Sequence, residues 1–230
     1  MIDRQSLVER AHDAIVEAIC AGTLAPGEPL RQERLAGMLG VSRQPIHEAL
    51  ALLARQGLVA NHGRRGVCVA PLDAAFVRQL YGVRGALDGL AAREAALRAN
   101  PALGRAGRAL IERGRRAVAA GERAALIQAD VAFHAFIYER SGNSMIARTL
   151  DMHWIHIRRV MAEVLRTPDA RPASALERIW DEHAAILDAI VSGDAAHAER
   201  SARAHGERAA AELIARLSDT DRNEKRPTAA

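Results

Sequence analysis

Four side chains in the second half of the sequence have the types and spacing needed to hold one metal ion. Asp130 and His134 lie four residues apart in a predicted helix, so they project from one face a turn apart. His183 and His205 lie in the last two predicted helices, which the short connection at 192–194 should make antiparallel neighbours. Three imidazoles and one carboxylate suit zinc or nickel, with manganese as a further candidate, and leave positions open for water or a ligand.

Such a metal site is compatible with several roles. A metal ion with open positions can activate water, which would make the chain a metal-dependent hydrolase. The sequence places no spare general base at a fixed spacing from the four residues, so we expect a binding protein and not an enzyme. A site that senses the metal alone and a purely structural metal site both stay open. Single histidines are more often structural, which is our expectation for His153, His156 and His197.

The segment that must position these residues has the pattern of an all-helical domain. Helix stops and capping signals, such as Asn100-Pro101, Gly121 and the Ser-Gly-Asn run at 141–143, divide it into helical stretches. The predicted helices are 73–99, 102–120, 122–140, 144–166, 173–192 and 194–217. We therefore expect an antiparallel helical bundle over residues 73–218, which would be a metal-binding and ligand-binding sensor domain. The polar residues 219–230 are expected to form a disordered tail.

The first 72 residues have the pattern of a winged helix-turn-helix. Predicted helices cover 7–21, 32–39 and 44–56, with Gly40 in the turn between the second and third and Ser42 placed to cap the third. Two short apolar runs, 58–60 and 67–70, flank a glycine-containing turn and predict a β-hairpin, the wing. The sequence thus predicts a mainly α protein with an N-terminal DNA-binding domain over residues 1–72.

Polar side chains in this domain are placed to contact DNA. The first turns of the third helix carry four of them, on the side away from the apolar residues: Ser42, Arg43, Gln44 and His47. Arg43 can pair bidentately with guanine and Gln44 with adenine. Arg64 and Arg65 lie at the hairpin tip, where they could reach phosphates or a minor groove. The alternative is that all these residues form an ordinary solvated surface.

Composition and charge fit this assignment. The chain has 230 residues and a net charge of +4, and between positions 31 and 65 arginines outnumber acidic residues. Its two cysteines, Cys20 and Cys68, have neither disulfide-framework nor zinc-finger spacing, and no run of 18 apolar residues is free of charge. We expect a cytoplasmic protein with no membrane partner.

The segment AGMLGVSRQPIHEALALLARQGL at 36–58, with the preceding ICAGTLAPGEPLRQERLA, resembles the transcription regulators of the GntR family. The resemblance covers the first 70 residues. It implies a homodimer bound to an inverted-repeat operator in double-stranded DNA, with Arg31 near the DNA together with the third-helix residues and the wing. His47 departs from the family pattern, which usually has arginine at that position, so a DNA contact there would be weaker or sensitive to pH.

Residues 73–217 resemble the FCD ligand-binding domain of the FadR-type subfamily. The spacing Asp-x-x-x-His at 130–134, the Glu-His-x-x-Ile segment at 182–186 and the later His205 match its metal signature. Arg84, in LYGVRGALDGLAA, matches an arginine that faces the ligand cavity, where it could pair with a carboxylate effector. The alternative for Arg84 is a surface ion pair with Asp88. Our hypothesis is a repressor whose operator affinity is modulated by a small organic acid that binds the metal and Arg84.

Overall fold

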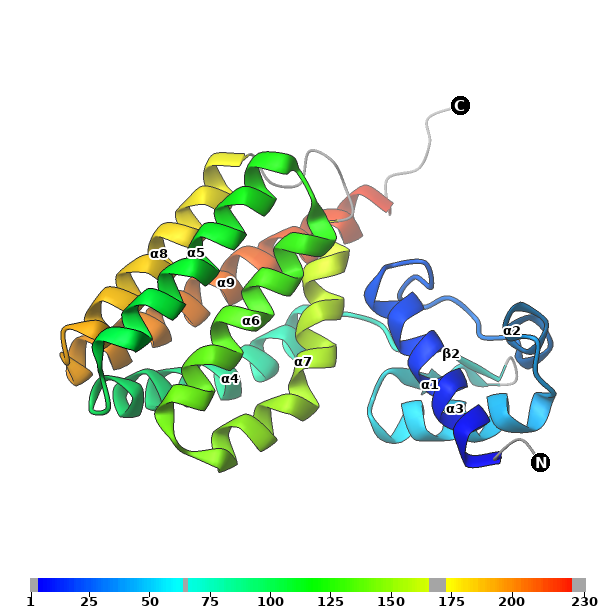
Figure 1. Ribbon diagram of the computed structural model, residues 1–230. Helices are drawn as coiled ribbons and strands as arrows, with labels where there is room; N and C mark the ends of the chain where they lie inside the picture. The colour runs from blue at the N-terminus through cyan, green and yellow to red at the C-terminus, as the bar shows by residue number, and fades with distance from the viewer. Residues whose placement is uncertain (1–3, 64–65, 166–172, 225–230) are drawn as a thin grey trace. The chain divides into compact units, whose positions relative to one another are not determined.

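The computed structural model describes residues 4–63, 66–165 and 173–224. The chain divides into two compact units, Met1–Leu72 and Asp73–Ala230. The described part is mainly helical with one small β-sheet, as Figure 1 shows. This confirms the predicted fold class. None of the helices in the described ranges has the length and hydrophobicity needed to cross a bilayer.

The first unit is a winged helix-turn-helix. Its elements are α1 (Arg4–Cys20), α2 (Gln32–Leu39), α3 (Arg43–Arg55), β1 (Val59–Asn61) and β2 (Val67–Val69). Gly40 ends α2 with φ of 64°, a left-handed conformation that glycine adopts without steric cost and that turns the chain into α3. The strands pair antiparallel with Val59 opposite Val69. Ile15 of α1, with Ile46 and Leu53 of α3, is fully buried in the core of this unit.

Two details of this unit differ from the sequence predictions. Ser42 is the residue preceding α3, as expected, but its side chain makes no capping hydrogen bond. The first strand runs over Val59–Asn61 and not over 58–60, because the backbone N–H of Leu58 donates to Leu53 O and closes the turn that follows α3. Arg64 and Arg65, the predicted wing contacts, lie outside the described residues.

The second unit is an all-helical bundle. Its helices are α4 (Ala74–Ala96), α5 (Pro101–Ala120), α6 (Arg123–Ser141), α7 (Ser144–Val164), α8 (Ala173–Val191) and α9 (Ala195–Glu224). Four of them begin at side-chain caps in the described part of the chain, where Asp73, Asn100, Asn143 and Asp194 accept hydrogen bonds from backbone N–H groups of the first turn. Figure 1 shows α5 alongside α6 and α8, and α9 packs against α8 and α4.

The last helix is longer than the sequence analysis predicts. Residues 219–224, assigned there to a disordered tail, continue α9 as far as Glu224. The physical reason is the absence of a helix breaker, because neither glycine nor proline occurs between Gly206 and Pro227. Residues 225–230 lie outside the described part of the chain.

Glycines in α5 allow α8 to pack closely against it. A Cβ atom on Gly107 would overlap the side chain of Leu187, and one on Gly114 would overlap the indole ring of Trp180. Both α8 side chains are almost completely buried. The glycines of α5 therefore create the space in which Trp180 lies in the interior of the bundle.

Candidate functional site

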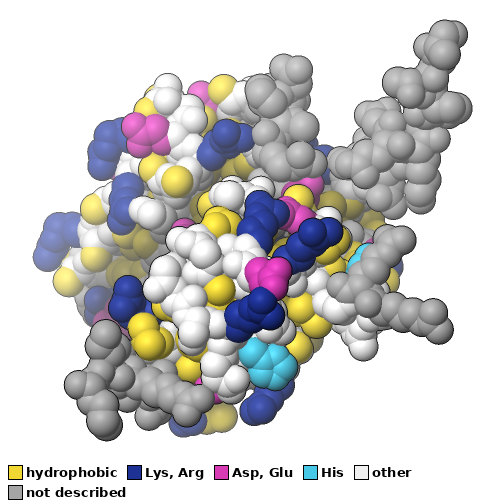
Figure 2. All heavy atoms as spheres, turned by 90° about the vertical axis from the view of Figure 1, so that its right-hand side faces the viewer, with side chains coloured by type: hydrophobic (Ala, Val, Ile, Leu, Met, Phe, Trp, Pro, Cys, Tyr) yellow, Lys and Arg dark blue, Asp and Glu magenta, His cyan; other side chains and the backbone are white. Residues whose placement is uncertain are grey.

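The first unit exposes the side chains predicted to contact DNA. Ser42, Arg43, Gln44 and His47 are exposed on the first turns of α3, opposite its buried face, and Arg31 is exposed immediately before α2. On the face of the molecule shown in Figure 2, basic side chains are more frequent than acidic ones. This arrangement matches a recognition helix with its N-terminal end free to enter a major groove.

The exposed DNA-facing candidates already have partners within the unit. Arg43 forms an ion pair with Glu33 of α2. Gln44 donates a hydrogen bond of 2.9 Å to Glu48, and the ring of His47 lies 3.3 Å from the amide nitrogen of Gln32. These contacts are on the surface and weak, so the side chains can exchange them for base or phosphate contacts at little cost.

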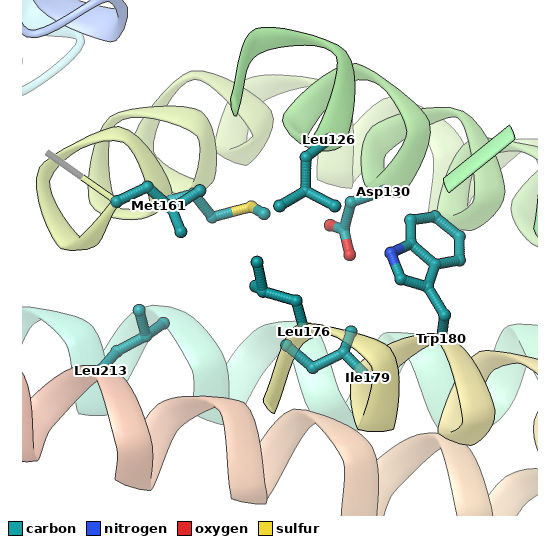
Figure 3. Close-up of a pocket in the computed structure, with 8 residues that line it drawn as sticks. Leu126, Asp130, Met161, Leu176, Ile179, Trp180 and Leu213 are labelled. Carbon is teal, nitrogen blue, oxygen red and sulfur yellow. The ribbon is translucent and has the colours of Figure 1, made fainter. Parts of the chain in front are cut away.

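In the second unit, an apolar pocket lies between α6, α7, α8 and α9. Its walls are aliphatic side chains, together with Met161 and the ring of Trp180, and Asp130 is the charged residue among those that line it. Figure 3 shows the Asp130 carboxylate turned toward the space between the helices. The pocket therefore has one polar end, and that end lies at the predicted metal site.

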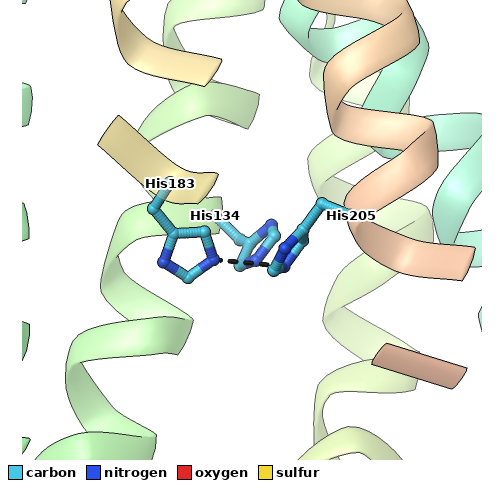
Figure 4. Close-up of side chains that lie close together, drawn as sticks. All are labelled: His134, His183 and His205. Atoms are coloured by element: carbon cyan, nitrogen blue, oxygen red, sulfur yellow. Dashed lines mark hydrogen bonds between the residues drawn. The ribbon is translucent and has the colours of Figure 1, made fainter. Parts of the chain in front are cut away.

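Three histidines from three helices meet at this end. His134 of α6, His183 of α8 and His205 of α9 each offer a ring nitrogen within 4.8 Å of the others, and all three rings are buried (Figure 4). The Nε2 atoms of His183 and His205 are 3.2 Å apart. Asp130 Oδ1 lies 3.6 Å from His183 Nε2 and 3.9 Å from His134 Nε2. The fold thus brings the four residues singled out by spacing into one cluster.

Carboxylates behind two of the rings orient their nitrogens. Glu182 accepts a hydrogen bond of 2.8 Å from Nδ1 of His205 and another of 2.7 Å from Nε of Arg208. With its proton on Nδ1, His205 turns an Nε2 lone pair toward the cluster. Asp88 Oδ2 lies 3.6 Å from Nδ1 of His134, which leaves Nε2 of that ring facing Asp130. Carboxylates behind coordinating histidines are a common feature of metal sites.

Burial keeps two of the histidines in the form that binds metal. Loss of hydration lowers the pKa of His183 well below its ordinary value, and the neighbouring histidines and Arg84 lower it further. Burial also lowers the pKa of His134, assisted by the positive charge of Arg84 and opposed by Asp88. Both rings are therefore neutral near pH 7, and a neutral imidazole has the lone pair that coordination requires.

The donor set fits a divalent transition-metal ion. Asp130 Oδ2 and His134 Nε2 are buried without hydrogen-bond partners among the described residues, an arrangement that is costly unless another group satisfies them. Nitrogens bound to one tetrahedral zinc ion lie about 3.3 Å apart, given bonds of about 2.05 Å. Small side-chain rotations would bring the ring nitrogens of the three histidines, now within 4.8 Å of one another, to that separation. His134, His183, His205 and Asp130 are the residues that could hold such an ion.

Arg84 of α4 is a buried cation beside this cluster. Its Nε lies 3.3 Å from Asp88 Oδ2, and its Nη2 lies 3.7 Å from Asp130 Oδ2. The guanidinium carbon is 5.3 Å from the ring centre of Tyr81 and 5.2 Å from that of Trp154. The ion pair with Asp88, considered above as a surface alternative, is therefore present but buried.

Neighbouring acidic side chains determine the charge of Arg84. Burial alone would lower the pKa of Arg84, but Asp88, together with Tyr81, Tyr138 and Asp130, outweighs this effect and raises it. Arg84 is therefore positively charged. Its Nε and Nη2 atoms have no hydrogen-bond partners among the described residues, so they can donate to an anion bound at the cluster.

Sequence reasoning missed three residues of this site. Asp88 was considered only as a surface partner of Arg84, although its carboxylate is buried, also accepts a hydrogen bond from Tyr138 and lies beside His134. Glu182 was noted only as a neighbour of His183, whereas it supports His205. Trp180 lines the pocket. The i,i+3 spacing of Trp180 and His183 was a signal for a shared helix face, but nothing in the sequence indicated which histidine Glu182 would contact.

Comparisons with known proteins agree with the geometry of both units. The model of the "Bacterial regulatory proteins, gntR family" matches residues 7–69, and that of the FCD domain matches residues 79–208. The chain is 32% identical over 182 residues to an uncharacterized HTH-type transcriptional regulator of Streptomyces ambofaciens, covering 79% of this chain and 74% of that protein. It is 26% identical over 204 residues to a probable D-xylose utilization operon transcriptional repressor of Paenarthrobacter nicotinovorans, covering 89% and 87%.

Other relatives match over a shorter length. An uncharacterized HTH-type regulator of Agrobacterium vitis is 37% identical over 90 residues, so the match covers 39% of this chain and about half, 53%, of that protein. A match of this length supports conclusions only about the part of the chain that it covers.

Solved structures share the fold. McbR/YncC of E. coli superposes with a TM-score of 0.76 at 19% identity, covering 94% of this chain and 100% of that one. A GntR regulator of Rhodococcus sp. RHA1 superposes with a TM-score of 0.75 at 23% identity, covering 91% and 98%. Together with the two matching domain models, these findings show that the chain belongs to the GntR family of bacterial transcription regulators, in the FadR-type group that carries an FCD domain.

Proposed function

We propose that the chain is a homodimeric repressor whose operator affinity is modulated by a small organic acid bound at a metal centre in the helical domain. The observation that carries this proposal is the buried cluster of His134, His183, His205 and Asp130 with the buried cation Arg84 beside it. A cation and a metal ion next to one pocket would together recognise a carboxylate. A metal centre with a purely structural role would not require Arg84.

Each part of the cluster has a task in this proposal. The four residues would hold the ion, and a bound divalent ion would supply a Lewis acid for a carboxylate oxygen. Arg84 would donate hydrogen bonds to the same carboxylate, with its guanidinium held between Tyr81 and Trp154. Asp88 would orient Arg84 and compensate its charge when no acid is bound.

The carboxylates around the cluster favour binding over hydrolysis. Asp88 and Glu182 are candidates for a general base, but hydrogen bonds and cations hold both in the charged form. The pKa of Asp88 is lowered to about 2, because His134 and Arg84 outweigh the effect of its burial. The pKa of Glu182 is also lowered to about 2, since its hydrogen bonds to His205 and Arg208 outweigh burial. A general base works best with a pKa near the working pH, so neither group suits that role.

Binding of the acid and binding of the operator would be coupled through the conformation of the dimer. An acid that binds one conformation of the dimer more tightly shifts the population toward it, and operator affinity changes if the two conformations space their DNA-binding domains differently. The relative from Paenarthrobacter nicotinovorans, a probable repressor of an operon, supports repression as the mode of action. Such a regulator would act in the cytoplasm, where the operator DNA is located.

Fluorescence-anisotropy titration of operator DNA tests the proposal. The protein is stripped of metal, refilled with zinc, nickel or manganese, and titrated with and without a panel of carboxylates. We expect at least one acid to change operator affinity about tenfold in the metal-loaded protein and to have no effect in the metal-free protein. Constant affinity across the panel would contradict the proposed effector. If the metal alone changes the affinity, the chain is a metal sensor.

A matched pair of arginine variants localises the effect. Arg84→Lys keeps the buried charge but removes the planar pair of donors, so the acid concentration that gives a half-maximal response should rise about tenfold. Arg93→Lys makes the same change at an exposed position of the same helix and should respond as the unmodified protein does. Equal responses in the two variants would remove Arg84 from the binding site.

A further inference from the structure

The pocket next to the cluster is strongly apolar. Leu126, Met161, Leu176, Ile179 and Leu213 line it, together with the buried ring of Trp180. Figure 3 shows these side chains pointing into one space, with Asp130 at its edge. A wall of this composition offers dispersion contacts and hydrophobic burial, whereas a ligand hydroxyl placed against the aliphatic side chains would lose its hydrogen bonds to water.

The polar end of the pocket fixes how an acid would enter it. Asp130 connects the pocket with the cluster, because it lines the pocket and its Oδ1 faces His134 and His183. Its Oδ2 lies 3.7 Å from Nη2 of Arg84. A carboxylate held at the cluster therefore has its remaining carbon atoms next to the apolar wall. This inference rests on the proposed function, since it takes the cluster as the site of the acid group.

Trp180 contributes an unused donor to the same space. Its indole Nε1 is buried and has no hydrogen-bond partner among the described residues. Figure 3 shows this nitrogen on the side of the ring turned toward Asp130. The six-membered part of the indole packs onto Gly114 of α5, where any larger residue would displace it. A fixed, buried N–H group without a partner is costly, and an oxygen of a bound ligand would satisfy it.

The size of the pocket limits the ligand. Its volume is about 40 Å³, which exceeds the space of roughly 10–15 Å³ needed for one water. It is much smaller than the roughly 150 Å³ cavity that accommodates benzene. A short hydrocarbon tail fits this volume, and Met161 can move aside for a slightly longer one because its side chain is flexible and unbranched.

We infer that the effector is a short aliphatic monocarboxylate whose acid group binds at the cluster and accepts a hydrogen bond from Trp180 while its tail fills the apolar pocket. Polyhydroxylated acids fit poorly, because their hydroxyl groups would face leucine and isoleucine side chains. Dicarboxylates fit poorly as well, since a second charge would be buried without a partner at the apolar end.

Isothermal titration calorimetry of the zinc-loaded protein with acids of increasing length tests the inference. The series is acetate, butyrate, valerate and hexanoate, with gluconate and succinate for comparison. Affinity should rise about fourfold for each methylene that enters the pocket, until the tail exceeds the available space. Gluconate and succinate should bind more weakly than valerate by at least tenfold.

A pair of methionine variants shows whether the tail occupies this pocket. Met161→Ala removes part of the pocket wall, so the length of the tightest-binding acid should increase by about two carbons. Met145→Ala makes the same change at an exposed position of the same helix and should leave the preferred length unchanged. Because the expected result is a gain of affinity for longer acids, a poorly folded variant cannot imitate it.

Trp180→Phe tests the hydrogen bond separately from the tail. It should weaken every acid about fivefold while keeping the increment for each methylene, since it removes the donor and retains most of the ring. Tighter binding of gluconate than of valerate, or an unchanged length preference in Met161→Ala, would overturn the inferred effector class and leave the proposed function standing. Absence of binding by every acid in the zinc-loaded protein would overturn the proposed function itself.

Discussion

Replacing Glu182 by glutamine should weaken zinc binding without unfolding the bundle. Glu182 does not belong to the four candidate ligands, but it accepts hydrogen bonds from His205 and Arg208 and holds the His205 proton on Nδ1. Glutamine has nearly the same size and can still accept one hydrogen bond, so the packing is preserved. The substitution removes the negative charge that orients the His205 ring and that would favour a bound cation behind it.

The magnitude follows from the kind of hydrogen bond that changes. Hydrogen bonds to charged groups contribute about 1.5–3 kcal/mol, against about 0.5–1.5 kcal/mol for neutral pairs. The Glu182 side chain is 19% exposed, so solvent weakens the effect and the lower part of the difference applies. A loss of about 1 kcal/mol corresponds to an about fivefold higher Kd for zinc, slightly below the roughly tenfold to hundredfold range known for supporting residues of metal sites.

Zinc affinity is measured by competition with a chromophoric chelator at pH 7. Glu177→Gln is the matched control, because it makes the same substitution at an exposed position of the same helix and should bind zinc as the unmodified protein does. Circular dichroism of the metal-free variants checks that both remain folded. If both variants show the same Kd within twofold, Glu182 does not support His205 as a ligand, and the argument for the orientation of that ring is wrong.

Three further predictions concern the DNA-binding surface, the packing of α5 and the buried histidines. Arg43→Ala should weaken binding to the specific operator by about 10- to 100-fold, because a base contact is lost, and should lower the affinity for unrelated DNA much less. Anisotropy titrations with both DNAs measure the two affinities. An unchanged preference for the operator would refute the assignment of α3 as the recognition helix. Gly114→Ala should destabilise the bundle by about 1–3 kcal/mol, since its Cβ would overlap Trp180, whereas Gly82→Ala, at a helical position open to solvent, should not lower the melting temperature. The melting temperature of the metal-free protein should fall as the pH is lowered from 7 to 5. The pKa of His183 is lowered in the folded state, so below the ordinary histidine pKa this side chain binds a proton in the unfolded chain but not in the folded one. A melting temperature independent of pH over this range would contradict the burial of His183 as a neutral ring.

The sequence determined the elements of this protein and the set of candidate ligands. Helix boundaries follow from local signals, because capping side chains such as Asn100 and terminal glycines such as Gly121 act within a few residues of the chain. The i,i+4 spacing of Asp130 and His134 places both on one face of any helix that contains them. The end of α9 was the exception, since a polar composition does not by itself stop a helix that has no glycine or proline.

Tertiary structure alone decided which groups support the ligands and what the pocket can accept. Asp88 meets His134 across α4 and α6, and Glu182 meets His205 across α8 and α9, at distances that depend on how the helices pack. The position of Trp180 depends on the missing side chain of Gly114, a residue 66 positions earlier in the chain. Burial lowers the pKa of His183, and it leaves the Trp180 N–H without a partner among the residues that the structure describes. It is a property of the packed bundle, so no local pattern in the sequence encodes it.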